Sequence, residues 1–335
     1  MTRYEMAQIV AKALAKGANV DKLAAEFADE LDALGVRVAA LEKKSDNVKI
    51  TGQVRYRYYH TTKRDGGNKE SKNDLRSRIW FVGQVNDSWK YTGMVENVQN
   101  FTNNIGDETT DFQRAWVDGR IGGAKVTAGR FQNALGGSVV YDARMDGVKL
   151  AYGNAKANIY GYYGKPSTKK AAPWRTPYDE MYGVGVAAKF GKVGVDAGYD
   201  VFKDPTAASG WAPVAGLDDN KIFNVGLKVD LGKSANLGFR YLHTSEKVNA
   251  GDSKNGYVID LGFLGAKANK PGSWGITARY MDVGGMIPMS YVDDNSPAFV
   301  GSDYANYAGD NPGNLDKREG WKGYEVKANY TFAKN

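Results

Sequence analysis

Arginine side chains are the groups in this sequence whose spacing most clearly indicates a chemical role. Several occupy alternate positions of neighbouring segments, so an extended segment projects them from one face. Guanidinium groups stay charged and donate several hydrogen bonds each, so a cluster of them raises the local concentration of anions. We predict that one such set lines a water-filled space. Its members are Arg55, Arg57, Arg76, Arg78, Arg114, Arg120 and Arg144.

Groups for covalent, metal or cofactor chemistry are scarce. The chain has no Cys and two His, which argues against a thiolate nucleophile, a disulfide framework and a His-rich metal site. Both His60 and His243 fall on the apolar face of their segments, which makes them poor members of a catalytic triad. The acidic residues between 293 and 310 lack EF-hand spacing, so we expect solvated loop charge there and leave calcium binding open. We predict no catalytic residues, no cofactor and no enzyme.

Composition narrows the class of protein further. The 335 residues are 42% hydrophobic and 12% aromatic, with 41 Gly and a net charge of +7. The mean hydropathy of −0.51 is too polar for a helical membrane protein. The basic residues alternate along segments instead of clustering on one helix or stripe, so we expect no nucleic-acid partner. Abundant Gly and Tyr suit many short, tightly turned strands.

Period-two alternation of apolar and polar side chains extends from residue 48 to the end of the chain. Phe223, Val225 and Leu227, for example, alternate with Asn224 and Gly226. Fourteen such runs are predicted to be strands, near 48–60, 74–86, 88–99, 111–121, 124–131, 145–152, 155–164, 180–190, 193–203, 220–231, 235–246, 255–266, 273–283 and 321–332.

The connections between these runs alternate in length. Short turns such as Asp87-Ser88 and Gly122-Gly123 alternate with long connections such as 61–73, 132–144 and 284–320. Bacterial outer-membrane barrels have this pattern, with short periplasmic turns and long external loops. The predicted fold is therefore an all-β transmembrane antiparallel β-barrel of about 14 strands, possibly 16. A soluble two-domain β protein is the alternative.

The two faces of the strands are predicted to be inverted relative to a soluble barrel. Fourteen strands enclose more volume than inward side chains fill, and the polar faces carry 15 basic and 7 acidic residues. We expect those charges to line an aqueous lumen and the apolar faces to meet outer-membrane lipid. Trp80, Trp116, Tyr160 and Tyr162 also fall on the luminal face, which leaves a sugar-specific channel possible.

The connection 132–144 is the third predicted external loop. It contains glycines for tight bending and an apolar centre. We expect it to fold into the barrel and to narrow the pore, with Asp142 facing the arginines of the wall and creating a transverse field. An ordinary exposed loop is the alternative.

The first 47 residues differ in character, being rich in Ala, Leu, Glu and Lys. Thr2 is a predicted N-cap for a helix over 3–16 that ends at Gly17. A second helix is predicted from Val20 to Lys44, with apolar residues at heptad spacing. We interpret it as a self-associating coiled coil, or alternatively as a helix whose seam packs on other parts of the protein. The predicted domains are 1–17, a coiled-coil stalk over 18–47 and a barrel over 48–335.

Several segments resemble known families. Residues 127–131 and 144–150 resemble general bacterial porins, and Tyr330-Thr331-Phe332 resembles the aromatic-ended signal read by the barrel-assembly machinery, apart from three trailing residues. The opening Thr2-Arg3-Tyr4-Glu5 resembles the hallmark near the end of an S-layer homology (SLH) domain. In combination, these features resemble SLH-bearing porins of the OmpM type from diderm Firmicutes.

That resemblance implies a function and partners. It implies a homotrimeric outer-membrane porin for passive diffusion of small hydrophilic solutes, with a periplasmic stalk and an SLH domain that binds peptidoglycan or a wall-attached polymer. Arg3 and Glu5 occupy the hallmark positions, so they would be the peptidoglycan-binding remnant of a domain that is mostly missing from this chain. The alternatives are a channel specific for a sugar or an anion and, with less support, a barrel-embedded hydrolase.

Overall fold

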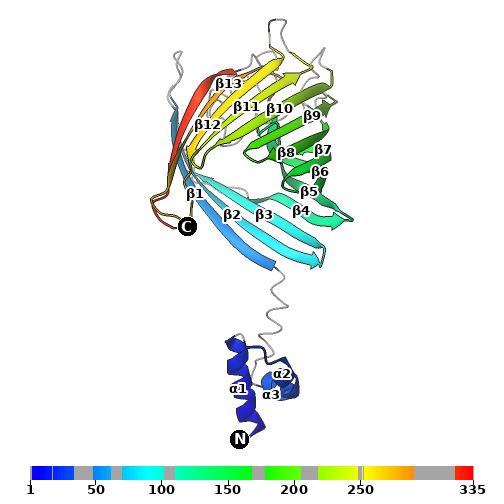
Figure 1. The fold of residues 1–335 in the computed structure, drawn as a ribbon, viewed down its shortest axis with the longest axis vertical. Coiled ribbons are helices and arrows are strands. Elements are labelled where there is room, and N and C mark those ends of the chain that lie inside the picture. Colours follow the sequence, from blue (N-terminus) through cyan, green and yellow to red (C-terminus); the bar gives the residue numbers. More distant parts are fainter. Residues whose placement is uncertain are drawn as a thin grey trace.

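The computed structural model describes residues 2–16, 18–33, 48–61, 70–101, 110–167, 178–204, 218–247, 251, 253–289 and 321–334. Within these ranges, three short helices precede one antiparallel sheet (Figure 1). The strands are β1 (Val48–Thr61), β2 (Glu70–Asn86), β3 (Trp89–Asn100), β4 (Thr110–Ile121), β5 (Ala124–Leu135), β6 (Tyr141–Gly153), β7 (Ala157–Ser167), β8 (Glu180–Phe190), β9 (Val193–Lys203), β10 (Asn220–Leu231), β11 (Ala235–Thr244), β12 (Asn255–Leu264), β13 (Trp274–Val283) and β14 (Trp321–Tyr330).

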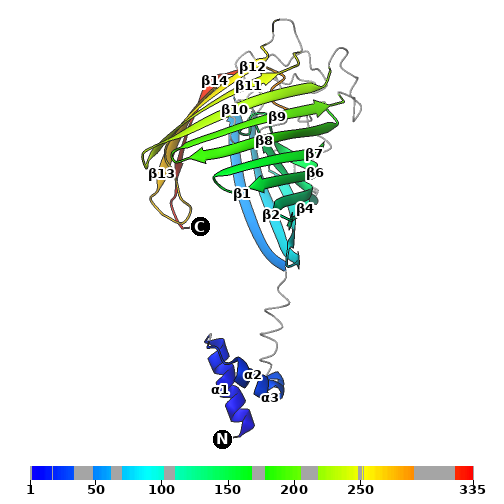
Figure 2. The same cartoon turned by 45° about the vertical axis from the view of Figure 1, so that its right-hand side comes forward.

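Each strand pairs with its neighbours in sequence, so the order runs from β1 to β14 without a crossover. The sheet curls back on itself (Figures 1 and 2). The prediction of fourteen antiparallel strands is confirmed. Among the described residues no hydrogen-bonded pairing joins β1 to β14, so closure into a complete barrel stays a prediction.

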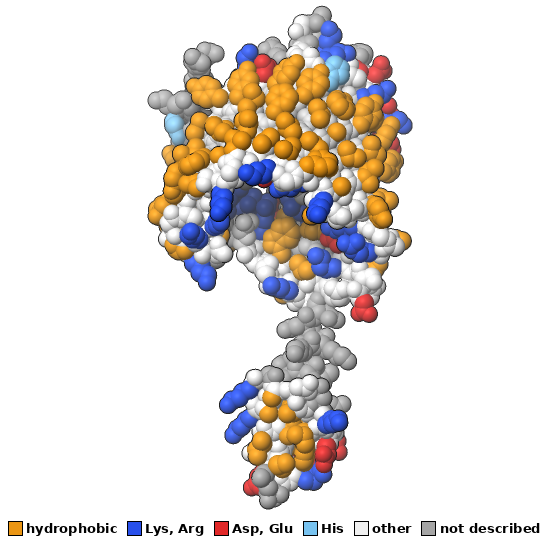
Figure 3. Space-filling view, viewed as in Figure 1, with side chains coloured by type: hydrophobic (Ala, Val, Ile, Leu, Met, Phe, Trp, Pro, Cys, Tyr) orange, Lys and Arg blue, Asp and Glu red, His pale blue; other side chains and the backbone are white. Residues whose placement is uncertain are grey.

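The outer face of the sheet is apolar, as the alternation predicts. On β10, Phe223, Val225 and Leu227 are 39–43% exposed. Ile222 and Asn224, which occupy alternate positions on the same strand, are at most 2% exposed. The same contrast recurs along most strands and forms a band of apolar side chains over the curved sheet (Figure 3). A soluble sheet places its apolar face against a core, so this arrangement is inverted.

The largest apolar cluster lies on the opposite, inner face of the curl. It joins the ends of β7 to β13 to the segment 284–289 and to the tip of the β5–β6 hairpin. Met145, Phe202 and Met281 are completely buried there. The fold therefore has an apolar exterior and an interior that is partly apolar and partly charged.

The helices α1 (Arg3–Ala15), α2 (Asp21–Glu26) and α3 (Ala28–Ala33) form a separate small cluster. Thr2 caps α1 as predicted: its hydroxyl accepts a hydrogen bond from the backbone N–H of Glu5, and the Glu5 carboxylate accepts one from the backbone N–H of Thr2. Ala7 and Val10 of α1 pack against Phe27 and Leu31, all four at most 6% exposed. None of the helices in the described ranges is long and apolar enough to cross a membrane.

The predicted continuous helix from Val20 to Lys44 is wrong in its described half. The helix ends at Glu26, and a new one begins at Ala28. Phe27 and Leu31, two residues of the predicted seam, pack on α1 of the same chain, so that part of the seam is already covered. Residues 34–47 lie outside the described ranges, and a coiled coil there stays a prediction.

We predict that the outer face does not tolerate charge. Val225→Lys at the centre of β10 should lower the free energy of unfolding by about 2–4 kcal/mol in lipid vesicles, because the ammonium group would have to leave water. Urea titration of the reconstituted protein measures this.

Thr277→Lys is the matched control, because Thr277 is exposed on the inner face. It should cost much less than Val225→Lys. Equal losses for the two variants would contradict the assignment of the faces.

Candidate functional site

The end of the β5–β6 hairpin leaves the wall and enters the interior of the curl. The pairing of β4 with β5 stops at Ala115 and Arg130, whereas β5 and β6 stay paired as far as Leu135 and Tyr141. The connection is therefore only 136–140, shorter than the predicted loop of 132–144, because most of that segment continues the two strands. We call residues 131–145 the crossing hairpin.

The tip of the crossing hairpin rests on the opposite wall. A methyl group at Gly137 would lie 2.6 Å from the Nε of Arg240 on β11. The backbone N–H of Met289 donates to the carbonyl of Val140 at 2.7 Å. Val139 and Val140 are at most 1% exposed. The structure therefore places this segment inside the curl, as the sequence predicts.

The two faces of the crossing hairpin differ because alternate residues point in opposite directions. Phe131, Leu135, Tyr141 and Met145 form one face and belong to the apolar cluster. Burial of these four side chains fixes the hairpin against the inner ends of β7 to β13.

The other face of the hairpin is polar and contacts β4. Arg114 donates to the Oε1 of Gln132 at 2.7 Å, and the amide of Gln132 donates to Asp142 at 2.5 Å. Arg144 donates to the side chain of Gln113, next to Arg114 in sequence. Asp142 is therefore linked to Arg114 through Gln132, and its predicted transverse field across a pore stays a prediction.

The wall opposite this polar face carries further ion pairs. Arg57 contacts Asp74 at 2.5 Å, and Arg78 contacts Glu96 at 2.6 Å, with Arg76 4.0 Å from the same carboxylate. Arg55 pairs in register with Arg76. The structure thus gathers the predicted arginines on β1 to β4 and β6, with one exception.

Arg120 is that exception. It is exposed at the end of β4, where it donates to the carbonyl of Gly123 in the β4–β5 turn at 3.5 Å. A separation of an even number of residues along a strand places two side chains on the same face but at different distances from the strand end. Arg120 therefore shares the face of Arg114 without sharing its surroundings.

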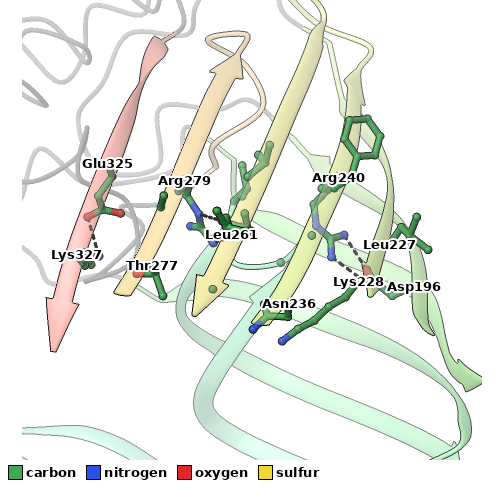
Figure 4. Close-up of a pocket in the computed structure, with 18 of the residues that line it drawn as sticks. Asp196, Leu227, Lys228, Asn236, Arg240, Leu261, Thr277, Arg279, Glu325 and Lys327 are labelled. Carbon is green, nitrogen blue, oxygen red and sulfur yellow. Dashed lines mark hydrogen bonds and ion pairs between the residues drawn. The ribbon is translucent and has the colours of Figure 1, made fainter. Parts of the chain in front are cut away.

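A second charged wall lies on β9 to β14, and the predicted site did not include it. Three ion pairs follow one another across it (Figure 4). They are Asp196–Arg240 at 2.7 Å, Asp260–Arg279 at 2.5 Å and Glu325–Lys327 at 2.8 Å. These residues border a cavity of about 430 Å³. Their luminal positions follow from the alternation. The pairing of Asp196 with Arg240 and of Asp260 with Arg279 also depends on the register between strands, whereas Glu325 and Lys327 are on the same strand.

Aromatic side chains on the inner face take two different roles. Trp80 and Trp116 meet edge to face with ring centroids 6.2 Å apart, and the guanidinium of Arg114 lies 5.8 Å from the Trp80 ring centroid. Tyr160 lies beneath the ammonium of Lys149 at 4.4 Å. Tyr162 is buried and donates to Asp200 at 2.7 Å, so it belongs to the packed interior and not to a sugar track.

The two histidines form local hydrogen bonds at strand ends. His60 Nδ1 is hydrogen-bonded to the hydroxyl of Ser71 at 2.7 Å, and His243 Nδ1 to Asn255 at 2.9 Å. Both imidazoles are exposed at strand ends, and within the described ranges no carboxylate orients the His60–Ser71 pair. The described residues also contain no group of three or more acids or histidines that could hold a metal ion.

Arg3 and Glu5 serve the local structure of the helical cluster. Arg3 contacts Glu30 at 2.6 Å, donates to the carbonyl of Glu26 at 3.0 Å and lies 5.1 Å from the Phe27 ring centroid. Glu5 closes the capping box. The hydrogen bond from Arg3 stabilises the carboxylate and lowers the pKa of Glu30. Both hallmark residues thus hold α1 in place, and wall binding stays a prediction.

Comparison with known proteins gives a fold and no family. No family model matches the sequence, and no curated protein is similar to it. Among solved structures, a five-substitution variant of the Rhodopseudomonas blastica porin matches with a TM-score of 0.51 and 13% identity over 85% of this chain and 90% of that one. A triple mutant of the same porin gives a TM-score of 0.50 over the same shares. The chain therefore has a porin-like fold.

We predict that Gly137 is required for seating the crossing hairpin. Gly137→Ala should speed amide hydrogen exchange over 131–145, because the methyl group would overlap Arg240 and the backbone φ of +63° disfavours a side chain. The comparison is Gly122→Ala, where φ is +57° and nothing lies within 4 Å of the added methyl. Equal exchange over 131–145 in both variants would mean that the Arg240 contact is unimportant.

We also predict a pH dependence of the helical cluster. The folded state lowers the pKa of Glu30. At pH values above about 4.3, the ordinary pKa of a glutamate, the ion pair with Arg3 therefore contributes its full stabilisation to the cluster. That stabilisation should disappear as the pH falls through the lowered pKa. Hydrogen exchange over α1 at stepped pH measures it, and Glu30→Gln should remove this part of the pH dependence.

Proposed function

We propose that this chain is an outer-membrane porin through which small hydrophilic solutes diffuse passively. The observation that carries the proposal is the inverted sheet. Its outer face is apolar, its inner face is charged, and a hairpin crosses the interior. Apolar side chains on the exterior are stable in contact with lipid, and charged side chains on the interior are stable in contact with water and ions.

The mechanism needs no bond to form or break. A solute would enter the lumen, pass the crossing hairpin and the charged inner wall, and leave at the other mouth. Charges of both signs at the narrow part of the lumen would orient a dipolar solute and the water around it. Flux would then depend on the width of that part and on its field.

Attachment and assembly are the finer parts of the proposal. The helical cluster would be the end of a wall-binding domain, so the protein would also tether the outer membrane to peptidoglycan, and three copies would assemble. The observation that supports tethering is the capped helix at the SLH-like hallmark, which forms a cluster of its own ahead of the sheet.

The lumen is predicted to prefer anions weakly. Reversal potentials in a KCl gradient across a planar bilayer should indicate this preference, more strongly at low salt, because screening shortens to about 8 Å at physiological ionic strength. Replacing Arg76 and Arg78 by Gln should shift the reversal potential toward cations, since two positive charges beside Glu96 would be removed.

Three outcomes would count against this reading. Absence of conductance would contradict the channel itself. A clear cation preference of the unmodified protein at low salt would mean that acidic groups control the narrow part, and an unchanged potential in the double variant would place Arg76 and Arg78 outside it.

Tethering makes a separate prediction. A form of the protein that carries a complete SLH domain should sediment with purified peptidoglycan sacculi, whereas residues 48–335 alone should stay in the supernatant. Equal sedimentation of both would contradict a wall-binding role for the N-terminal region. Chemical cross-linking of the same samples reports whether three copies assemble.

A further inference from the structure

The turn between β12 and β13 is longer than the connection of two antiparallel strands requires. It spans residues 265–273, whereas the turns at 122–123 and 191–192, at the same end of the sheet, consist of two residues each. Two residues are enough to join antiparallel strands. The additional length carries two basic side chains, Lys267 and Lys270.

Hydrogen bonds hold these two lysines close together. They pair as an isolated antiparallel bridge, in which the backbone N–H of Lys270 donates to the carbonyl of Lys267 at 2.8 Å. The hydroxyl of Ser273 accepts a hydrogen bond from the backbone N–H of Lys267 and donates one to the carbonyl of Lys270, both at 2.7 Å. The backbone N–H of Gly272 donates to the carbonyl of Thr331, just after β14, at 2.8 Å. The turn is therefore an ordered part of the fold, and both lysine side chains leave the backbone at neighbouring points.

A cavity of about 530 Å³ lies between this turn and the neighbouring turn of β10 and β11. Lys233 borders it from the β10–β11 turn, and Lys267 and Lys270 border it from the longer turn. Its lining contains no Asp or Glu, and within the described ranges none of the three lysines forms an ion pair. Like charges around one space repel one another, so an anion in the cavity would be stabilised.

The same cavity has an apolar side. Leu264 and Trp274 border it and are 45% and 43% exposed. Trp274 belongs to the outer face, where its ring centroid lies 5.9 Å from that of Phe263. Tryptophan at the end of a membrane-spanning strand is typical of the boundary between lipid and water. Lys and Arg side chains gather along the lower edge of the apolar band in Figure 3, so the cavity lies where that band gives way to charge.

We propose that this cavity binds an anionic phospholipid, with the phosphate between Lys233, Lys267 and Lys270 and an acyl chain against Trp274. The inference rests on the proposed function, because it requires the outer face to lie in a membrane. Short turns of outer-membrane barrels lie on the periplasmic side, so the lipid would come from the inner leaflet. Ammonium groups bind phosphate as point charges, and basic clusters at a membrane surface attract anionic headgroups. A soluble anionic polymer would use the lysines and leave Trp274 without contact.

Native mass spectrometry of the detergent-solubilised full chain measures binding. The probes are phosphatidylglycerol, phosphatidylcholine with the same acyl chains and no net charge, glycerol 3-phosphate without chains, and polyglutamate as a soluble anionic polymer. We expect phosphatidylglycerol to bind at a concentration at least about tenfold lower than each of the other three, since attraction of the phosphate by lysines and apolar contact of the chain act together.

Variants separate the charged part of the site from the apolar part. Replacing Lys233, Lys267 and Lys270 together by Gln should raise the concentration required for phosphatidylglycerol about tenfold and leave phosphatidylcholine unchanged. Trp274→Ala should weaken both lipids alike and preserve the ratio between them, because the chains are the same and the lysines remain.

The matched control replaces three other exposed lysines near turns at the same end of the sheet, Lys90, Lys125 and Lys156, by Gln. It removes the same charge, and none of the three borders the cavity. Since β3, β5 and β7 are distant in sheet order from β11 and β13, salt should screen these charges, and phosphatidylglycerol binding should stay within about twofold of the unmodified protein.

The outcomes distinguish this inference from the channel on which it rests. A protein that conducts in planar bilayers but binds the two lipids alike overturns the site and leaves the channel. Equal losses from the two triple variants also overturn the site, because the charge of the whole edge would then attract lipid. Polyglutamate binding as tightly as phosphatidylglycerol would assign the lysines to a soluble polymer and overturn the lipid site. A protein that prefers phosphatidylglycerol through these lysines without conducting overturns the channel and keeps the site.

Discussion

Alternation of side chains along paired strands is the constraint on which the rest of this structure depends. Once fourteen strands pair in sequence order, every second residue of each must share one environment. Here the outer set is apolar and the inner set contains most of the strand charges, so the sheet suits a non-polar surrounding and encloses polar groups. A one-residue slip in any pairing would exchange the two sets, which strongly specifies the register.

The crossing hairpin divides the enclosed space. Its apolar face packs on the inner ends of β7 to β13, and this packing leaves the polar face directed at β4. Apolar packing and polar hydrogen bonding thus act on opposite faces of one short segment. Burial of Phe131, Leu135 and Tyr141 fixes its position. Hydrogen bonds join Gln132 to Asp142 and Arg144 to Gln113 of β4.

The charges of the interior follow two patterns with different consequences. On β9 to β14, opposite charges alternate around the wall and satisfy one another, so that surface is polar without a strong net field. Beside the hairpin, glutamines replace carboxylates as the partners of two arginines. An ion pair cancels much of the charge of an arginine, whereas an amide partner satisfies its hydrogen bonds and cancels none of its charge.

The sequence by itself determined what depends on local periodicity and on residue type. The fourteen strands, the apolar and charged faces and the cap at Thr2 all follow from alternation, turn residues or capping preference. Only the tertiary structure decided which elements meet across long distances. In the structure Arg120 lies apart from the other arginines, and β5 and β6 extend through most of the predicted loop. Helix α1 packs on Phe27 and Leu31. Periodicity fixes the direction of a side chain but not its partner, because partners depend on register, height along the strand and packing between segments far apart in sequence.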